Sequence, residues 1–199
     1  MGWVALDAPD APSQIARLSA NPKLVGLRPM LQDLPDNEWL LRPQLTPALD
    51  AMKRAGLCLD ALVKPRHLPA LTEFLARHEQ LPVVIDHGAK PDIAKSGLEP
   101  WAQYMRHLGG NSQAFCKLSG LANEAGPGWN ADMLKPYVDV LLESFGPRRL
   151  MWGSDWPGLN LAGDYAGWLD LAETLTKQLT SSERDAIFGG TAASFYGLT

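Results

Sequence analysis

Short apolar runs alternate with segments of helical periodicity along the whole chain. Six β-like runs occur, at Trp3 to Leu6, Leu24 to Leu31, Leu57 to Val63, Pro82 to Asp86, Ala114 to Leu118 and Arg149 to Trp152. Successive runs begin ~20 to 35 residues apart, which is the length of one strand-plus-helix unit. Because a parallel connection needs a crossover, which a helix supplies, this alternation predicts an α/β fold with a parallel sheet.

The segments between these runs carry the start and stop signals of helices. One helix is predicted to begin at a proline, Pro43 or Pro47, and to stop at Gly56, which matches the preference for early proline and late glycine. Further helices are predicted over Leu68 to Glu79, Glu99 to Leu108 and Asp132 to Phe145. Late in the chain, Thr180-Ser181-Ser182-Glu183 matches a capping box at the start of a short helix.

Polar residues gather just after the ends of several predicted strands. These groups are Arg28 to Gln32, Lys64 to His67, Asp86 to Gly88, Lys117 to Gly120 and Gly153 to Asp155. A TIM barrel places its chemistry at the carboxyl ends of many strands, whereas an open sheet concentrates it at one crevice. No G-x-G-x-x-G follows the early strands, so a barrel is favoured over a dinucleotide-binding sheet.

Composition narrows the class of protein. The 199 residues are 46% apolar, which suits one domain over residues 1–199. The formal net charge is -4, with no basic stripe, so nucleic acid is not an expected partner. No apolar run approaches the ~20 residues of a membrane span and no basic leader precedes one, which predicts no membrane association and a cytoplasmic location. Cys58 and Cys116 lie in apolar runs and are interpreted as core residues.

The strongest candidate for catalysis is Asp155. An apolar strand there ends in a small-residue turn that presents the carboxylate between Trp152 and Trp156. An aspartate beside aromatic surface is partly desolvated, which raises its proton affinity and suits it to take a proton from water. The structural alternative is an aspartate that caps a turn or a helix.

His87 is the second candidate. It follows the buried run Val83 to Ile85 in Asp86-His87-Gly88-Ala89-Lys90, where it can bind a metal, carry a proton or polarise a carbonyl. The alternative is a hydrogen-bonded structural histidine. Asp86 alternates away from His87 and is expected to orient its neighbours.

Several basic residues follow strand ends and are candidates for binding a carboxylate or hydroxyls of a substrate. Arg28 is the strongest because it lies inside an apolar run. The other predicted substrate contacts are Lys90, Lys117, His67 and Trp156. Lys64 and Arg66 are interpreted as solvated charges at the rim.

Four phrases of the chain resemble a known family. They are Gly26-Leu27-Arg28-Pro29-Met30-Leu31-Gln32-Asp33, Val84-Ile85-Asp86-His87-Gly88-Ala89-Lys90-Pro91, Cys116-Lys117-Leu118-Ser119-Gly120-Leu121 and Trp152-Gly153-Ser154-Asp155-Trp156-Pro157. In this order they are similar to amidohydrolase-related family 2 of the amidohydrolase superfamily, and most similar to its L-fuconolactonase and 2-pyrone-4,6-dicarboxylate lactonase group.

The resemblance implies a (β/α)8 barrel and a hydrolase that opens a sugar-acid lactone or a related cyclic ester. It implies that Asp155 activates the hydrolytic water, that His87 polarises the carbonyl, and that Arg28 contacts the substrate. Where a divalent metal such as zinc is bound, His87 and Asp155 are its implied ligands. The implied partner is a small molecule, a lactone or a sugar carboxylate.

The chain also departs from the family pattern. Family members begin with a strand that carries a His-x-His pair, and no such pair occurs in this sequence. Trp3 to Leu6 corresponds to the family's third strand, so the expectation is a barrel that lacks its first two βα units and retains six strands. Open sheet edges favour pairing with another chain, which leaves a homo-oligomer as an option.

Two other functions stay open at this point. One is a metal-dependent decarboxylase of the same superfamily, and the other is a truncated remnant that binds without turnover. Substrate specificity is expected to reside in loops such as Asn123 to Asn130, because function depends on the site and not on the fold alone.

Overall fold

The computed structural model describes residues 1–198, and its centre is a parallel sheet with the strand order β1-β2-β3-β4-β5. The strands are β1 (Gly26–Leu27), β2 (Cys58–Ala61), β3 (Val83–Ile85), β4 (Phe115–Leu118) and β5 (Leu150–Trp152). Each strand pairs with the next one along the chain. This order confirms the predicted parallel α/β fold, and it is the order in which strands follow each other around a TIM barrel.

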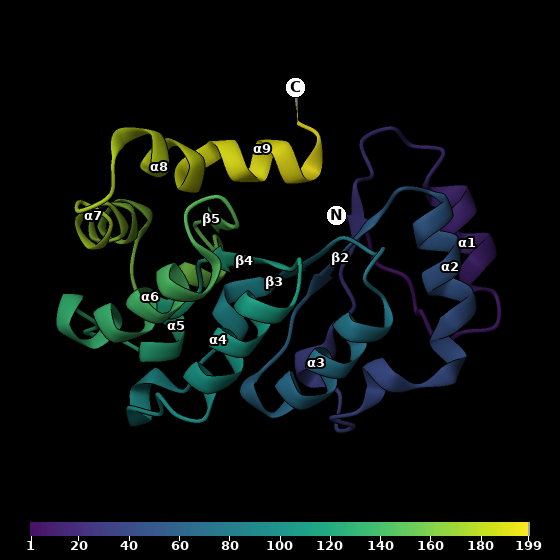
Figure 1. Cartoon of the computed structure of the whole chain (residues 1–199), viewed down its shortest axis with the longest axis horizontal. Helices are drawn as coiled ribbons and strands as arrows, with labels where there is room; N and C mark the ends of the chain where they lie inside the picture. Colours follow the sequence, from purple (N-terminus) through teal and green to yellow (C-terminus); the bar gives the residue numbers. More distant parts are fainter. Residues whose placement is uncertain (199) are drawn as a thin grey trace.

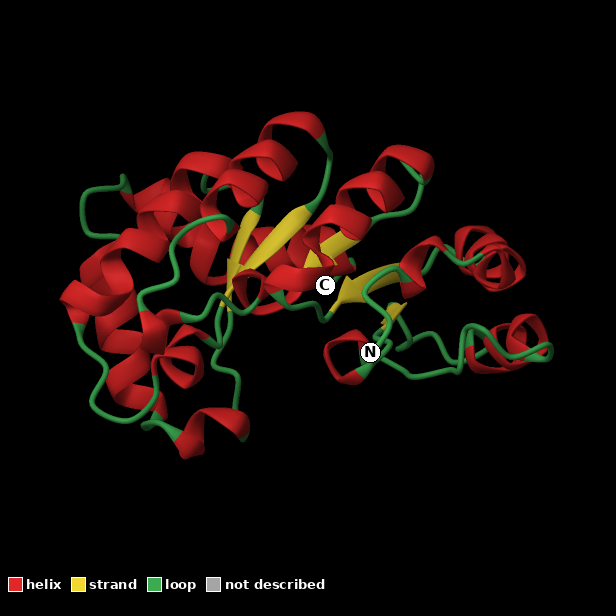
Figure 2. Cartoon of the chain, turned by 90° about the horizontal axis from the view of Figure 1, so that it is seen from below, coloured by secondary structure: helices red, strands yellow, loops and turns green. Residues whose placement is uncertain are grey.

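Helices surround the sheet, as Figure 2 shows for the red segments around the yellow strands. They are α1 (Ala11–Leu18), α2 (Thr46–Arg54), α3 (Leu68–Arg77), α4 (Trp101–Asn111), α5 (Leu121–Ala125), α6 (Ala131–Phe145), α7 (Tyr165–Leu175), α8 (Ser181–Asp185) and α9 (Thr191–Tyr196). In Figure 1, α3 and α4 lie below the strands and α9 lies above them. The sheet is therefore covered on both faces near β3 and β4.

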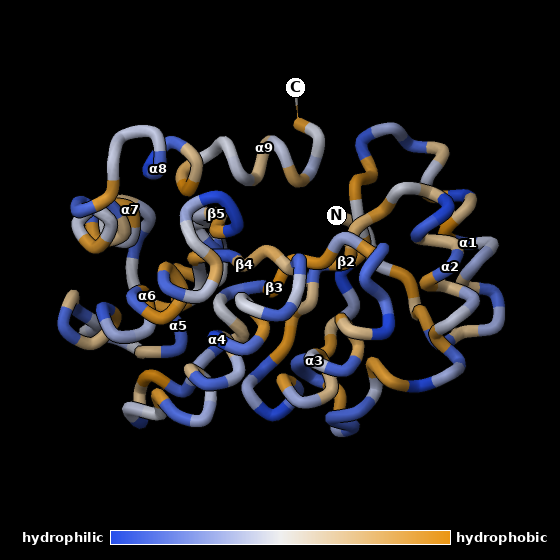
Figure 3. The backbone as a smooth tube through the Cα atoms, in the orientation of Figure 1, coloured by the Kyte–Doolittle hydropathy of each residue, from blue (hydrophilic) through white to orange (hydrophobic). Residues whose placement is uncertain are grey.

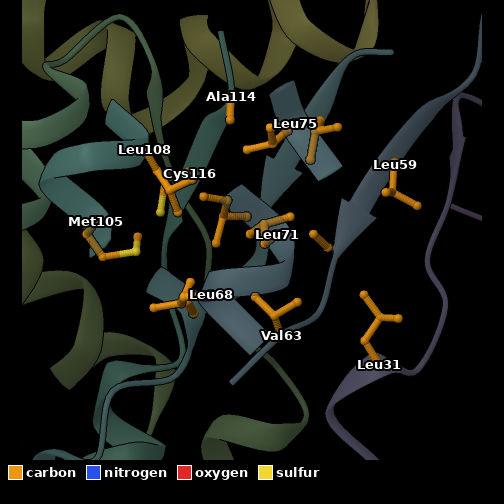
Figure 4. Close-up of a cluster of buried hydrophobic side chains, with 14 of the residues drawn as sticks. Leu31, Leu59, Val63, Leu68, Leu71, Leu75, Met105, Leu108, Ala114 and Cys116 are labelled. Atoms are coloured by element: carbon orange, nitrogen blue, oxygen red, sulfur yellow. The ribbon is translucent and has the colours of Figure 1, made fainter. Parts of the chain in front are cut away.

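The face of the sheet toward α3 and α4 is apolar. Leu71 of α3 and Leu108 of α4 are buried beside Cys116 of β4 (Figure 4). Orange, hydrophobic stretches of the tube are visible near β3 in Figure 3. Because successive side chains of a strand point to opposite faces, Phe115 and Lys117 project to the other face, where Phe115 meets Phe195 of α9.

The first apolar run, Trp3 to Leu6, does not form the expected strand. The chain makes one isolated parallel bridge, between Gly2 and Leu27, and Trp3 is 61% exposed. The amide of Gly2 donates to Gly26 and the amide of Arg28 donates to Gly2. The next residue is Pro29, which has no N–H with which to extend the ladder. The sheet therefore has five strands where six were predicted, and β1 is only two residues long.

The predicted helix starts agree with the structure more closely than the predicted first strand does. A 3₁₀ turn at Pro43–Leu45 leads directly into α2, so both prolines lie at the start of the predicted helix. Thr180 and Glu183 form the expected capping box at α8. Cys58 and Cys116 are buried free thiols, as their apolar neighbours predicted. Within residues 1–198, no helix is long and apolar enough to cross a membrane.

Candidate active site

His87 and Asp155 meet at the carboxyl ends of β3 and β5. His87 Nε2 lies 3.4 Å from Asp155 Oδ1, and the two side chains are 12% and 22% exposed. The residues are far apart in the sequence, but parallel strands present their carboxyl ends at the same edge of the sheet. The fold thus brings together the two predicted catalytic residues.

Both residues have a left-handed backbone conformation, which residues other than glycine rarely adopt. The φ angles are 53° at His87 and 58° at Asp155. Such left-handed conformations persist where the surroundings hold them, and they are concentrated at functional sites. Two buried indoles hold these turns: Trp101 donates to the carbonyl of Gly88, and Trp168 donates to the carbonyl of Gly153.

The imidazole of His87 is oriented by the turn after β4. Its Nδ1 lies 2.8 Å from the Ser119 hydroxyl. Next to Ser119, Gly120 has a φ of +70°, and a Cβ there would lie 2.7 Å from the His87 Cβ and 3.0 Å from its Nδ1. Only glycine therefore fits at position 120 without a shift of the histidine.

The surroundings of His87 favour the neutral imidazole. Burial lowers its pKa to about 4, the nearby Asp155 carboxylate opposes this, and the cations Lys117, Arg28 and Lys90 add to the lowering. The geometry then favours the tautomer in which the Ser119 hydroxyl donates to Nδ1 and the Nε2 proton points toward Asp155. A neutral imidazole with this proton can donate to a carbonyl oxygen.

The carboxylate of Asp155 is held from a third element. The Asn123 side-chain amide, in α5, donates to Asp155 Oδ2 at 2.8 Å. This bond fixes one oxygen, whereas the other faces His87. Asn123 and His87 are the polar contacts of this carboxylate among the described residues, and Trp156 is 67% exposed.

A buried ionic network lies beneath this pair. Lys117 Nζ is 2.5 Å from Asp60 Oδ2 and 2.6 Å from Asp86 Oδ1, and both aspartates are fully buried. Arg28 contacts the same carboxylates, at 3.1 Å for Asp60 and 2.8 Å for Asp86. The Tyr196 hydroxyl of α9 donates to Asp60 at 3.0 Å, and burial together with Asp60 raises the pKa of this tyrosine.

Two of the predicted substrate contacts, Lys117 and Arg28, belong to this ionic network. The Lys117 side chain is 13% exposed and is held between two carboxylates, whereas Arg28 is 34% exposed. Asp86 contacts both cations, and it directly precedes His87 in the chain. The expectation that Asp86 orients its neighbours stays a prediction.

Lys90 joins three strand-end segments near His87. Its ammonium donates to the Gln32 side chain at 3.0 Å and lies 3.0 Å from Glu124 Oε1. The side chains of Lys90 and Glu124 are 20% and 23% exposed, so this ion pair is partly shielded from solvent. Lys90 also has a left-handed backbone, with φ 53°.

The remaining candidates make no hydrogen bond or ion pair with the side chains of His87 and Asp155 among the described residues. His67 is buried at 3% exposure, and its Nδ1 accepts the Lys64 amide proton at 2.9 Å. Burial lowers the pKa of His67. Arg66 donates to Asn37 and to two carbonyls of the loop after β1, so it anchors a loop and is not simply solvated. A substrate contact by His67 or Trp156 stays a prediction.

The His87 and Asp155 pair supplies two donor groups of the kind that bind a metal. His87 Nε2 and Asp155 Oδ1 lie close enough to share one ion, but the described residues contain no cluster of three His, Cys, Asp or Glu ligands. Catalytic zinc sites use three protein ligands as a rule. The described residues alone therefore do not fit a complete zinc site.

Several site residues were not singled out from the sequence. Asp60 carried a usable signal, since it is a lone charge inside a buried apolar run. Ser119 lies in one of the four phrases, and Asn123 and Glu124 lie in the loop assigned to specificity. Tyr196 gave no local signal, because its contact with Asp60 joins residues 136 positions apart.

Comparisons with known proteins find relatives that match nearly the whole chain. The chain is 48% identical to an L-fucono-1,5-lactonase of Burkholderia ambifaria, over 98% of this chain and 69% of that protein. It is 34% identical to an L-fucono-1,5-lactonase of Burkholderia multivorans, over 100% of this chain and 71% of that protein. A crystal structure of a Burkholderia multivorans amidohydrolase with bound zinc is 35% identical, with a TM-score of 0.92, and the match covers 100% of this chain and 73% of that one.

The sequence match to a family is equally extensive. The model of the amidohydrolase family matches residues 1–198, which include every strand of the sheet and both residues of the His87 and Asp155 pair. The four phrases noted in the sequence lie within this match. We conclude that the chain belongs to the amidohydrolase family.

Proposed function

We propose that this protein hydrolyses the cyclic ester of a sugar-acid lactone, with Asp155 as the base that activates water. The observation that carries the proposal is the pairing of Asp155 with a neutral, oriented His87 at the carboxyl ends of two strands. The two relatives named L-fucono-1,5-lactonases support a lactone as substrate.

In this reaction Asp155 takes a proton from water while the water oxygen bonds to the lactone carbonyl carbon. The carbonyl oxygen gains negative charge, and the Nε2 proton of His87 stabilises it by hydrogen bonding. When the ring C–O bond breaks, the proton held by Asp155 passes to the leaving oxygen. The products are a free hydroxyl and a carboxyl group, which ionises, and Asp155 returns to its starting state.

The neighbouring side chains support these roles. Ser119 fixes the tautomer of His87, and Asn123 holds one carboxylate oxygen of Asp155, so that the other oxygen can face water. Arg28, with a partly exposed guanidinium, is the proposed substrate contact among the basic residues. The divalent metal implied by the resemblance stays a prediction, because the described residues do not form a complete zinc site.

The test is hydrolysis of L-fucono-1,5-lactone by the purified protein, followed by proton release. Asp155→Asn is expected to lower kcat by about 10² to 10⁴-fold, as loss of a general base does, with unchanged thermal unfolding. Asp139→Asn, which neutralises an exposed aspartate paired with Lys135, is the matched control and should keep full activity. Hydrolysis by Asp155→Asn within about twofold of the parent protein would show that another group activates water.

The same purified protein separates the two alternatives. Zinc in the protein together with carbon dioxide release from an aromatic carboxylate would favour the decarboxylase. Binding of a lactone without any turnover would favour the non-catalytic remnant.

We also propose that residues 1–199 behave as one domain related to the eight-stranded barrel. One continuous apolar core runs from Val4 to Ile187, which supports this view. A single cooperative loss of the near-ultraviolet circular dichroism of the tryptophans on heating would agree with it. Two separate transitions would contradict it.

A further inference from the structure

The cations around His87 are all paired with carboxylates. Within residues 1–198, Lys117 and Arg28 share Asp60 and Asp86. Lys90 is paired with Glu124. The amide of Asn123 donates to Asp155, and within the described residues no lysine or arginine pairs with this carboxylate. With the three cations engaged by other carboxylates, the carboxylate of Asp155 leaves a negative charge at the reacting centre.

This balance decides which substrates the site can accept. A lactone that carries carboxylates would have to approach Asp155 without a free cation to receive its charge, and in a partly buried site unpaired like charges repel strongly. An uncharged lactone meets no such repulsion. Its hydroxyls can both donate and accept, and the Lys90, Glu124 and Gln32 group offers donors and acceptors side by side.

We propose that Glu124 is a specificity-determining residue that restricts the site to uncharged, hydroxyl-bearing lactones, because it keeps the Lys90 ammonium paired and unavailable to a substrate carboxylate. Lys90 is the cation best placed to change partners. Lys117 is held between two fully buried aspartates, whereas Lys90 pairs with one carboxylate within residues 1–198, that of Glu124. The inference rests on the proposed lactone hydrolysis for its substrate class, but the exclusion of anions can be measured without turnover.

The same charge balance has a consequence for the product. Hydrolysis turns an uncharged lactone into a carboxylate, and this anion forms beside Asp155 and the paired Glu124. Repulsion then favours its release. The Lys90 and Glu124 ion pair thus disfavours the anionic product as well as anionic substrates.

The experiment measures binding of isophthalate, a planar dianion that cannot be hydrolysed, by isothermal titration calorimetry. In Glu124→Gln the Lys90 ammonium loses its partner, and isophthalate affinity should rise by about tenfold or more over the parent protein at low salt. Glu124→Asp keeps the negative charge, so its affinity for isophthalate should stay as low as that of the parent protein. Glu143→Gln, which neutralises the partner of Arg106 on the surface of α4 and α6, is the matched control and should not change binding.

A double variant tests whether the gain in isophthalate affinity depends on Lys90. In the double variant Glu124→Gln with Lys90→Gln, isophthalate affinity should return to that of the parent protein. The inference would be overturned by a parent protein that binds isophthalate as tightly as Glu124→Gln, or by a gain that survives in the double variant. Circular dichroism of each variant confirms that it is folded before binding is measured.

Activity separates this inference from the proposed function. The parent protein should hydrolyse L-fucono-1,5-lactone with a higher kcat/KM than the dianion 2-pyrone-4,6-dicarboxylate, and Glu124→Gln should narrow that ratio. If no lactone is hydrolysed at all, the proposed function fails, whereas the isophthalate titrations still test the role of Glu124. Equal kcat/KM values for both lactones in the parent protein would contradict the inference alone.

Discussion

The two faces of the sheet near β3 and β4 are built from opposite chemistry. Toward α3 and α4 the strands present aliphatic side chains and Cys116, packed against residues such as Leu71 (Figure 4). Toward α9 they present Lys117 together with the buried carboxylates Asp60 and Asp86. The apolar face gains stability from any well-packed side chain of the right size. The charged face is stable only while each charge keeps its partner.

Removal of one charge from the ionic network should have the largest effect. Lys117→Met keeps much of the side-chain volume but leaves Asp60 and Asp86 without their shared ammonium. The free energy of unfolding should fall by about 3 to 5 kcal/mol, the usual cost of breaking a buried ion pair. Urea denaturation measures it.

The control for this prediction is Lys95→Ala, since Lys95 pairs with Asp92 at the surface and is 82% exposed. Its unfolding free energy should change by less than about 1 kcal/mol. If Lys117→Met were as stable as the parent protein, the stability of the charged face would not depend on the pairing of its charges.

Truncation on the apolar face should destabilise the protein without changing its chemistry. Leu71 is fully buried in α3, and Leu71→Ala should cost about 3 kcal/mol through lost burial and a cavity. Lactone hydrolysis at low temperature should keep its kcat/KM, because the cavity lies on the face away from Asp155. Leu161→Ala, at a site 83% exposed, serves as control, and a selective loss of activity in Leu71→Ala would contradict the separation of the two faces.

Gly120→Ala should lower catalytic activity more than it lowers the free energy of unfolding. The added Cβ would collide with His87, and the φ of +70° would strain any residue with a Cβ, at a cost of about 1 to 3 kcal/mol. Displacement of the imidazole should lower kcat for lactone hydrolysis more than it changes KM. Gly110→Ala in α4 meets no atom within 4 Å and is the matched control; equal kinetics in the two variants would show that Gly120 does not position His87.

The smallest effect concerns pH. Burial lowers the pKa of His67 below its usual 6.5, so the unfolded chain binds this proton more tightly than the folded protein does. As the pH falls below 6.5, protonation therefore favours the unfolded state, and stability declines until the pH passes the folded pKa.

The non-titrating variant His67→Asn, whose amide oxygen can accept the Lys64 amide proton, should lack this part of the decline. Unfolding free energies measured from pH 8 to pH 5 should therefore converge for the two proteins toward low pH. Parallel curves over this range would show that His67 is not responsible.

The charged face was harder to predict from the sequence than the apolar one. Apolar periodicity indicated the strands and most of the helices, because a buried face repeats every two or every three to four residues. The same signal failed at Trp3 to Leu6, where hydrogen bonding to the neighbouring strand is limited by Pro29. For Lys117, strand-end position indicated a substrate contact, but position could not show that two carboxylates already hold its ammonium.

The order of strands and helices, the family phrases, and the strand-end positions of His87 and Asp155 could all be predicted from the sequence. These features depend on local periodicity and on residues adjacent in the chain. Tertiary structure alone decided which charges are paired: Lys90 with Glu124, Lys117 with Asp60 and Asp86, and Tyr196 with Asp60. An ion pair depends on the distance between side chains brought together by folding, and no spacing along the chain encodes that distance.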